Sequence, residues 1–517
     1  MSTIGSEATL RRIASFGSPV LLFVVFSLNA GLAAAASCGD LASLTLPNTT
    51  ITAETVAAGV FAQGTNGKQG AGPGFKDLPA FCRVAMTVKP SNDSDIKIEL
   101  WLPVSTWNKK FEANGNGGWS GVINPGSLAA GLRLGYATAM SDLGHEGGSG
   151  SFALGHPEKL IDFGYRATHE MAVKGKAVVK AFYGESPQYS IFNGCSAGGR
   201  QGLKEAQQFP EDFNGIVAGS PGLNWTGRSA QAVWIAQAVH KDEASTIPPD
   251  KFALIHTAAL EACDANDGVK DGVIEDPTRC RFNPKVLECK GADGPGCLTS
   301  AQVETARRIY AAVTNTRTKQ EIFPGHEPGS ELGWRTMASA NPFGIGLDLF
   351  KYVVFQDPNW DYRTFNFDSD MDATLKAGSD ILNASNPDLK PFMSRGGKLI
   401  QYHGWADPQI SPGSSVRYYK TVQDVMGGPG KVMDSYRLFM APGMAHCGGG
   451  DGPNRFDMIS ALEQWVEKGK APDSIIASRD KDGKVDRTRP LCPYPQVAIY
   501  KGSGSTDEAA NFSCKAQ

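Results

Sequence analysis

Short apolar runs recur along much of the chain, at the spacing of strands that enter and leave a buried sheet. Residues 96–102 alternate apolar and polar side chains, which predicts a half-buried strand. Helical spacing at residues 165–182 and a helix-forming stretch at 200–209 lie between such runs. Further strands are predicted at residues 110–113, 136–140, 189–193, 216–219, 398–402 and 436–440. This alternation predicts an α/β fold with a mostly parallel sheet and helices on its faces.

The pattern changes after Pro221 and resumes at Lys398. Between these points, helical pieces at residues 230–240, 251–263 and 299–313 are separated by loops rich in Cys, Pro and Gly. Residues 223–394 are therefore interpreted as an insertion between strands of one domain, which residues 37–222 and 395–517 build. No internal repeat marks a tandem domain.

The amino-terminal segment carries the one long apolar run. Arg11 and Arg12 precede the apolar residues 20–28, and small residues follow up to an Ala34-x-Ala36 site. This order is typical of a cleaved secretory signal, so residues 1–36 are predicted to be a signal peptide of a secreted or periplasmic protein. The alternatives are an uncleaved anchor, for which the core is short, and a lipoprotein at Cys38. No membrane association is expected after cleavage.

Composition narrows the function classes. The 517 residues are 41% hydrophobic and 20% charged, which is enough for a large core, and 60 Gly and 31 Pro make the chain rich in loops. The net charge of −3 includes no basic excess, so a nucleic-acid partner is not expected. The sequence leaves the oligomeric state open.

Ten cysteines, an even number in an exported chain, predict disulfides. Zinc ligation is the competing interpretation, and the spacing disfavours it because no Cys-x-x-Cys pair occurs. The sequence by itself does not fix which cysteines pair.

Gly194-Cys-Ser196-Ala-Gly198 matches the G-x-S-x-G pattern of a nucleophile elbow. A predicted strand precedes it and a helix-forming stretch follows, which is the setting that an elbow requires. The glycines permit the sharp turn that exposes the Ser196 hydroxyl. The alternative is a tight turn with a buried serine.

A base and an orienting acid are expected later in the chain, in the order Ser, acid, His. Asp407 and His446 each follow an apolar strand. Ser196 would attack an acyl carbon, His446 would take and return the proton, and Asp407 would hold the imidazole.

Other candidates for these roles are weaker. His403 shares the strand before Asp407 and is expected to pack or to contact that acid, while His145 is expected either near the site or in a loop. Asp434 could replace Asp407, but it precedes its strand. The remaining histidines lack an acid placed at a strand end: His156, His169, His240, His256 and His326.

Cys195 directly precedes the predicted nucleophile, and Cys447 directly follows the predicted base. If the triad assembles, these two cysteines must lie close together, and a disulfide would join the Ser and His loops. Cys195 is a poor nucleophile candidate, because a sulfur in a disulfide cannot attack.

These motifs together resemble the tannase and feruloyl esterase family over essentially the whole mature chain. The resemblance rests on Gly194-Cys-Ser-x-Gly-Gly-Arg200, the late Asp407 and His446-Cys447. It implies an α/β-hydrolase fold with a large inserted lid domain at residues 223–394, and a triad of Ser196, Asp407 and His446. It also implies five disulfides: Cys195–Cys447, Cys38–Cys82, Cys263–Cys280, Cys289–Cys297 and Cys492–Cys514.

The oxyanion hole is expected to use backbone amides, which are fixed donors aimed at developing charge. One is expected from Ala197, the residue after the nucleophile. The other is expected from the glycine-rich loop at residues 114–118, where Gly117 and Gly118 are not distinguishable. The alternative is that this loop is a simple turn.

Residues 263–276 concentrate oxygen ligands without matching an EF-hand, because Val269 stands where the sixth-position Gly is required. The resemblance implies a structural calcium site in the lid, held by Asp264, Asp267 and Asp271 with the carbonyls of Val269 and Val273. The alternative is a solvated acidic turn.

The resemblance implies an esterase for small aromatic esters, with feruloyl or gallate esters ahead of a terephthalate monoester (MHET). Arg335 and Arg363 are available to hold a free carboxylate of such a monoester, but nothing in the sequence marks either. Two rivals from other classes are a serine carboxypeptidase and a non-catalytic binding relative of the hydrolase fold.

Overall fold

The computed structural model describes residues 36–63 and 69–516, which form one compact unit. The predicted signal peptide lies almost wholly outside the described residues and stays a prediction. Within residues 36–63 and 69–516, no helix is both long and apolar enough to span a membrane.

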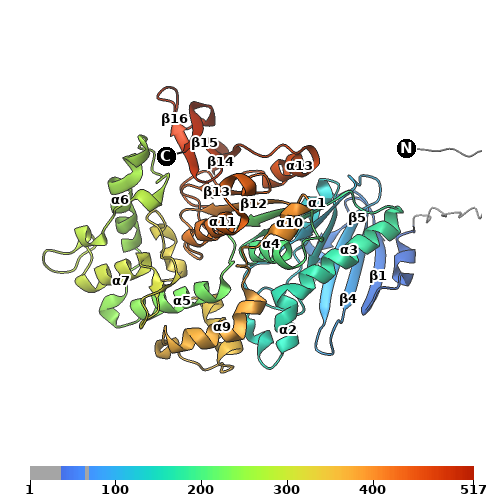
Figure 1. Ribbon diagram of the computed structural model, residues 1–517, viewed down its shortest axis with the longest axis horizontal. Helices are drawn as coiled ribbons and strands as arrows, with labels where there is room; N and C mark the ends of the chain where they lie inside the picture. Colours follow the sequence, from blue (N-terminus) through green and yellow to red (C-terminus); the bar gives the residue numbers. More distant parts are fainter. Residues whose placement is uncertain (1–35, 64–68, 517) are drawn as a thin grey trace, which may run out of the picture. The chain divides into compact units, whose positions relative to one another are not determined.

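A nine-stranded mixed sheet organises the fold (Figure 1). Neighbouring strands are antiparallel from the β1 edge as far as β7, and parallel from β7 to the β13 edge. In spatial order the strands are β1 (Thr49–Val56), β4 (Phe81–Val88), β5 (Ile96–Pro103), β7 (Ala137–Ser141), β6 (Lys110–Asn114), β8 (Tyr189–Cys195), β9 (Gly215–Gly219), β12 (Lys398–Gly404) and β13 (Tyr436–Ala441).

Helices cover both faces of this sheet because alternate strand residues point to opposite sides. Phe192 of β8 and Leu399 of β12 belong to the larger hydrophobic core, whereas Ile191 and Ile400 belong to the core on the other face. The first face is covered by α3 (Ala167–Tyr183), α4 (Ala197–Gln208) and α11 (Gly413–Met426), and the second by α1 (Pro125–Arg133) and α13 (Met458–Lys468). The predicted α/β-hydrolase architecture is confirmed.

The segment between β9 and β12 is mainly helical and lies on the side of the sheet away from β1 (Figure 1). Its helices are α5 (Trp225–Val239), α6 (Lys251–Cys263), α7 (Ser300–Tyr310), α8 (Gly344–Asp348), α9 (Ser369–Leu382) and α10 (Lys390–Ser394), with a small ladder of β10 (Val313–Thr314) and β11 (Glu321–Phe323). Its apolar side chains continue the larger core of the sheet. That this segment acts as a lid stays a prediction.

Short antiparallel ladders and helices complete the described chain. Near the carboxyl terminus, β14 (Ile475–Lys481) pairs with β15 (Lys484–Leu491), and β16 (Gln496–Tyr500) pairs with β17 (Phe512–Ala516). The remaining elements are β2 (Ala62–Gln63), β3 (Gln69–Gly74), α2 (Pro157–Ile161) and α12 (Pro429–Val432).

Two features of the sheet differ from the sequence-based expectation. The strand at residues 96–102 is buried on both faces, because Glu99 points inward and its charge is met by Arg83 at 2.7 Å and by the Trp101 indole. The antiparallel strands β1 and β4 were not predicted, because the sequence pattern assigned no strand to residues 37–95.

All five predicted disulfides are present, which confirms the pairing that the family resemblance implied. The pairs are Cys38–Cys82, Cys195–Cys447, Cys263–Cys280, Cys289–Cys297 and Cys492–Cys514. Among the described residues no cysteine is left free.

Candidate active site

Ser196 occupies a strained turn between β8 and α4. Its φ of 64° and ψ of −120° lie in a region that non-glycine residues rarely adopt. Close backbone packing makes this turn possible: a Cβ built on Gly194 would lie 2.6 Å from the carbonyl carbon of Gly198. The Ser196 amide donates to the carbonyl of Gly219 at 2.9 Å, which joins the turn to β9. This is the strand–turn–helix geometry of a nucleophile elbow.

The three predicted triad residues come together at the carboxyl ends of parallel strands. Nε2 of His446 lies 2.9 Å from Oγ of Ser196, and its Nδ1 lies 2.7 Å from Oδ2 of Asp407. A carboxylate can only accept, so Nδ1 carries the proton in this arrangement. Nε2 is then free to accept the Ser196 hydroxyl proton, as a general base requires.

The Asp407 carboxylate is completely buried and fully hydrogen-bonded. Oδ1 accepts from the amides of Gln409 and Ile410, and Oδ2 accepts from His403 as well as His446. Burial on its own would raise the pKa of Asp407, but the neighbouring His446 and the hydrogen bonds from both histidines hold it well below its ordinary value. Asp407 is therefore an anion that can balance the positive charge that His446 gains when it takes the Ser196 proton.

His403 contacts Asp407 from β12, as expected from its place before that acid. Its Nε2 lies 3.1 Å from Oδ2 of Asp407 and 3.1 Å from the carbonyl of Ile410, so it acts as a donor. Its Nδ1 lies 2.7 Å from the hydroxyl of Ser415 on α11. This chain of contacts fixes the carboxylate that orients His446.

Replacing His403 with phenylalanine is expected to lower kcat about tenfold while KM changes little, because Asp407 loses one of two charge-assisted donors on Oδ2. Steady-state kinetics at several pH values measure both constants. His156→Phe is the control, since His156 is exposed and pairs with Asp93. Equal kinetics for the two variants would exclude a positioning role for His403.

The predicted oxyanion residues lie beside Ser196. Ala197 begins α4, where a backbone amide has no partner inside the helix. Gly117 and Gly118 line the same cavity as Ser196, and the side chain of Gln201 accepts from the amide of Asn116 at 3.2 Å, which ties their loop to α4. Both glycines remain candidates for the second donor, and the oxyanion hole stays a prediction.

The Cys195–Cys447 disulfide joins the two loops that carry the nucleophile and the base. The Cα atoms of these cysteines are 6.0 Å apart and their sequence separation is 252 residues. Because each cysteine is directly bonded to Ser196 or His446 along the chain, the bridge limits how far these two residues can separate.

A cavity of about 410 Å³ opens onto Ser196 and His446. Trp225 and Arg228 of α5 and Ile345 of α8 contribute to its wall. Neither Arg335 nor Arg363 lines this cavity, so neither is placed to hold a substrate carboxylate here. Arg228 could not be identified from the sequence, because its burial beside the site depends on the packing of α5.

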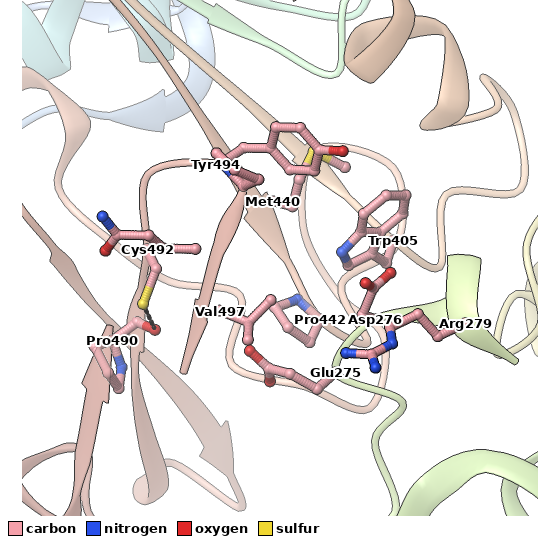
Figure 2. Close-up of a pocket in the computed structure, with 12 residues that line it drawn as sticks. Glu275, Asp276, Arg279, Trp405, Met440, Pro442, Pro490, Cys492, Tyr494 and Val497 are labelled. Atoms are coloured by element: carbon pink, nitrogen blue, oxygen red, sulfur yellow. Dashed lines mark hydrogen bonds between the residues drawn. The ribbon is translucent and has the colours of Figure 1, made fainter. Parts of the chain in front are cut away.

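A second cavity of about 220 Å³ lies away from the triad (Figure 2). Glu275, Asp276 and Arg279 lie at one end of it, and Met440 and Tyr494 lie at the other. Burial raises the pKa of Glu275 to about 8. No triad residue lines this cavity.

The predicted calcium loop has a donor set of hard oxygens, which fits calcium. Burial and the charge of Asp271 raise the pKa of Asp267, so the acidic groups crowd one another. In the structure, however, the Asp264 carboxylate accepts hydrogen bonds from the amides of Asp271 and Gly272, and the Asp271 carboxylate pairs with Arg489 of β15. A calcium shell would need these carboxylates to turn toward one ion, at the expense of the Asp271–Arg489 contact.

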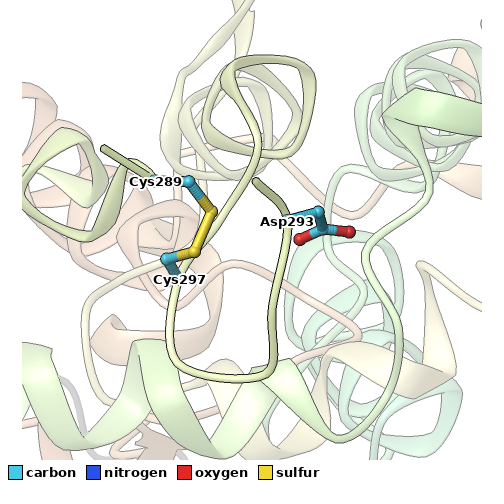
Figure 3. Close-up of side chains that lie close together, drawn as sticks. All are labelled: Cys289, Asp293 and Cys297. Atoms are coloured by element: carbon cyan, nitrogen blue, oxygen red, sulfur yellow. A yellow bond between two sulfur atoms is a disulfide. The ribbon is translucent and has the colours of Figure 1, made fainter. Parts of the chain in front are cut away.

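Two other clusters in the described part of the chain bring three ligand-type atoms within 4.8 Å of one another, and the predicted calcium loop is in neither. Cys289, Asp293 and Cys297 form the first (Figure 3), but the sulfurs are bonded to each other and Asp293 pairs with Lys251. A disulfide offers no thiolate to a metal.

His169, Glu205 and Asp212 form the second cluster. Lys176 and His169 pair with the Asp212 carboxylate. Burial and the neighbouring Asp212 raise the pKa of Glu205 well above its ordinary value. With Glu205 protonated, the charge of Lys176 balances that of Asp212 without a metal.

Comparison with known proteins agrees with this geometry. The family model described as tannase and feruloyl esterase matches residues 82–515. An uncharacterized esterase of Xanthomonas campestris pv. campestris is 38% identical over 552 residues, with 96% of this chain and 95% of that protein covered. A probable feruloyl esterase B-2 of Aspergillus oryzae is 38% identical over 453 residues, with 83% and 85% covered.

Solved structures give the same result. The crystal structure of feruloyl esterase B from Aspergillus oryzae has a TM-score of 0.86 at 33% identity, covering 92% of this chain and 99% of its own. Tannin acyl hydrolase from Aspergillus niger has a TM-score of 0.74 at 23% identity, covering 92% and 93%, and so supports the fold alone. This chain, with its G-x-S-x-G elbow, belongs to the tannase and feruloyl esterase family and is a carboxylic ester hydrolase with the α/β-hydrolase fold.

Proposed function

We propose that the protein is a secreted serine esterase that hydrolyses small aromatic carboxylic esters through an acyl-enzyme. The observation that carries the proposal is the continuous hydrogen-bond chain from Ser196 through His446 to Asp407. The two hydrogen bonds give the imidazole the tautomer that a general base needs. Export is supported by the five disulfides and by the predicted signal peptide.

In the proposed mechanism Oγ of Ser196 attacks the ester carbonyl carbon while Nε2 of His446 takes the hydroxyl proton. The amide of Ala197 and that of Gly117 or Gly118 would hold the negative oxygen of the tetrahedral intermediate. When the C–O bond breaks, the alcohol leaves with the proton from His446. Water then attacks the acyl-serine with His446 again as base, which releases the acid and restores Ser196.

The acyl group is proposed to be hydroxycinnamate or gallate. The cavity of about 410 Å³ is in the range of sites for small molecules, and relatives named feruloyl esterase cover most of the chain. Parallel assays with methyl ferulate, methyl gallate and a terephthalate monoester rank the three acyl groups. Faster turnover of the terephthalate monoester would make terephthalate the preferred acyl group in place of hydroxycinnamate and gallate. Release of amino acids from a blocked dipeptide would instead favour the carboxypeptidase alternative.

Calcium is proposed to stabilise the loop at residues 263–276, not to take part in the chemistry. Asp264, Asp267 and Asp271 would hold the ion together with carbonyls of Val269 and Val273, and none of these residues lines the cavity at Ser196.

Chelation is expected to lower Tm by about 5 °C or more while the initial rate at room temperature changes little, because a ligand of the folded state stabilises that state. Differential scanning calorimetry and rate assays with and without chelator measure both. Native protein that contains no calcium by metal analysis would contradict the proposal and leave Arg489 as the partner of Asp271.

A further inference from the structure

The guanidinium of Arg228 is buried in the wall of the cavity at Ser196, and no residue in the described part of the chain accepts a hydrogen bond from it. Arg228 lies in the first turn of α5 and is 4% exposed. Its Nε and Nη1 atoms are buried with no partner, and no ion pair to Arg228 is formed among the residues that the structure describes. A buried charge left without a partner destabilises the folded state, so its retention needs a reason.

Another buried arginine of this protein is held by oxygen atoms. The Nη atoms of Arg200 on α4 donate to the carbonyls of Gly164, Leu382 and Phe163, although its Nε has no partner. Both arginines lie against the Trp225 ring, and the guanidinium carbon of Arg228 is 5.6 Å from that ring and 5.0 Å from the Phe343 ring. Ring faces attract a cation but cannot accept its N–H groups as a carboxylate does.

The charge of Asp407 acts on Arg228, but the Asp407 carboxylate does not accept a hydrogen bond from Arg228. Both Asp407 oxygens are already occupied by two amides and two imidazoles. Burial lowers the pKa of Arg228 to about 10 and the Asp407 charge opposes this change, so Arg228 is a cation at neutral pH. The remaining source of an acceptor is the cavity, which Arg228 lines together with Ser196 and His446. Because Nε and Nη1 are closed to solvent, the side chain must turn toward the cavity to donate from them.

We propose that Arg228 is a specificity-determining residue that binds an oxygen acceptor carried by the substrate in the cavity at Ser196, with a carboxylate as the preferred group. The planar guanidinium can donate two parallel hydrogen bonds to a carboxylate, which is the geometry that arginine matches best. A phenol oxygen at the position of the substrate ring that would carry the carboxylate can also accept a hydrogen bond from Arg228. This inference rests on the proposed serine esterase function. Selection of a carboxylate would move the terephthalate monoester ahead of the hydroxycinnamate and gallate esters, whereas selection of a phenol oxygen would keep their order.

Three esters on one scaffold test the proposal: methyl benzoate, methyl 4-hydroxybenzoate and monomethyl terephthalate. Arg228→Met is expected to lower kcat/KM for monomethyl terephthalate at least about tenfold more than for methyl benzoate, mainly through KM. Arg228→Lys should recover part of this difference, because it restores the charge without the planar fork. A loss of the same size in kcat/KM for methyl 4-hydroxybenzoate would show that Arg228 binds a phenol oxygen as well as a carboxylate.

Arg363→Met is the matched control, because Arg363 is exposed, pairs with Asp361 and does not line the cavity. It is expected to give wild-type ratios between the three esters. Arg228→Met is also expected to keep or raise Tm, since it removes an unpaired buried charge.

Equal losses for all three esters, or no loss for any, would overturn the proposal, and a lowered Tm with equal losses would assign Arg228 a structural role. Failure of the underlying function looks different: wild-type protein would then hydrolyse none of the three esters.

Discussion

Replacing Ser196 with alanine is expected to lower kcat by more than about a thousandfold, because the members of a triad act as a unit. Nε2 of His446 would lose the hydroxyl that lies 2.9 Å away, and no other hydroxyl is hydrogen-bonded to it among the described residues. The fold should survive, since the change removes one oxygen at the edge of a cavity. Rates on an aromatic methyl ester, with Tm measured on the same preparation, test both parts.

Ser220→Ala is the matched control for this variant. Ser220 is also buried, follows the neighbouring strand β9, and its hydroxyl has no hydrogen-bond partner within the described chain. It is expected to keep wild-type turnover within about twofold, because its hydroxyl makes no hydrogen bond to a triad atom. Activity of Ser196→Ala within tenfold of wild type would exclude Ser196 as the nucleophile.

The double change Cys195→Ala, Cys447→Ala is expected to reduce turnover severely in a protein that still folds. Displacing reacting groups by about 1 Å can cost on the order of a hundredfold in rate. The disulfide holds the loops of Ser196 and His446 with Cα atoms of the two cysteines 6.0 Å apart. Four other disulfides remain to stabilise the fold. kcat at room temperature and Tm are the two measurements.

Cys263→Ala, Cys280→Ala provides the matched control, because it removes a bridge whose residues do not line the cavity at Ser196. Loop-closure entropy predicts a loss of about 3 kcal/mol of stability for the control and about 5 kcal/mol for Cys195–Cys447. At a temperature where both double variants are folded, only the variant without the Cys195–Cys447 bridge should lose turnover. If the two double variants keep the same kcat, the bridge at the active site has no catalytic role.

Much of the sheet and of the triad was predictable because the parallel strands are short apolar runs with the chemistry placed directly after them. Ser196, Asp407 and His446 each follow such a run, and parallel strands deliver their carboxyl ends to one edge. The strand β1 was missed because a half-exposed antiparallel strand carries a weaker apolar signal than a buried one. The strand β4 is mostly buried, but Arg83 interrupts its apolar run.

What the sequence could not predict depends on contacts between distant segments. In the sequence, Glu99 has the pattern of a solvent-facing position on a half-buried strand. In the structure it lies on β5 and pairs with Arg83 on the neighbouring strand β4, which allows it to be buried. Asp271 looked like a calcium ligand, and its contact with Arg489 comes from a segment 218 residues away. Arg228 is one arginine among many in the sequence, and its lack of an acceptor is visible only once α5 is packed against the active-site cavity.

Covalent labelling tests the acyl-enzyme account at the residue that it depends on. The wild-type protein is treated with an aryl fluorophosphonate, digested, and mapped by mass spectrometry while residual activity is followed. We expect one adduct per chain, on Ser196, with loss of activity in proportion to labelling and no adduct in Ser196→Ala. An adduct on a different residue, or full activity in protein labelled at Ser196, would contradict a mechanism in which Ser196 is the nucleophile.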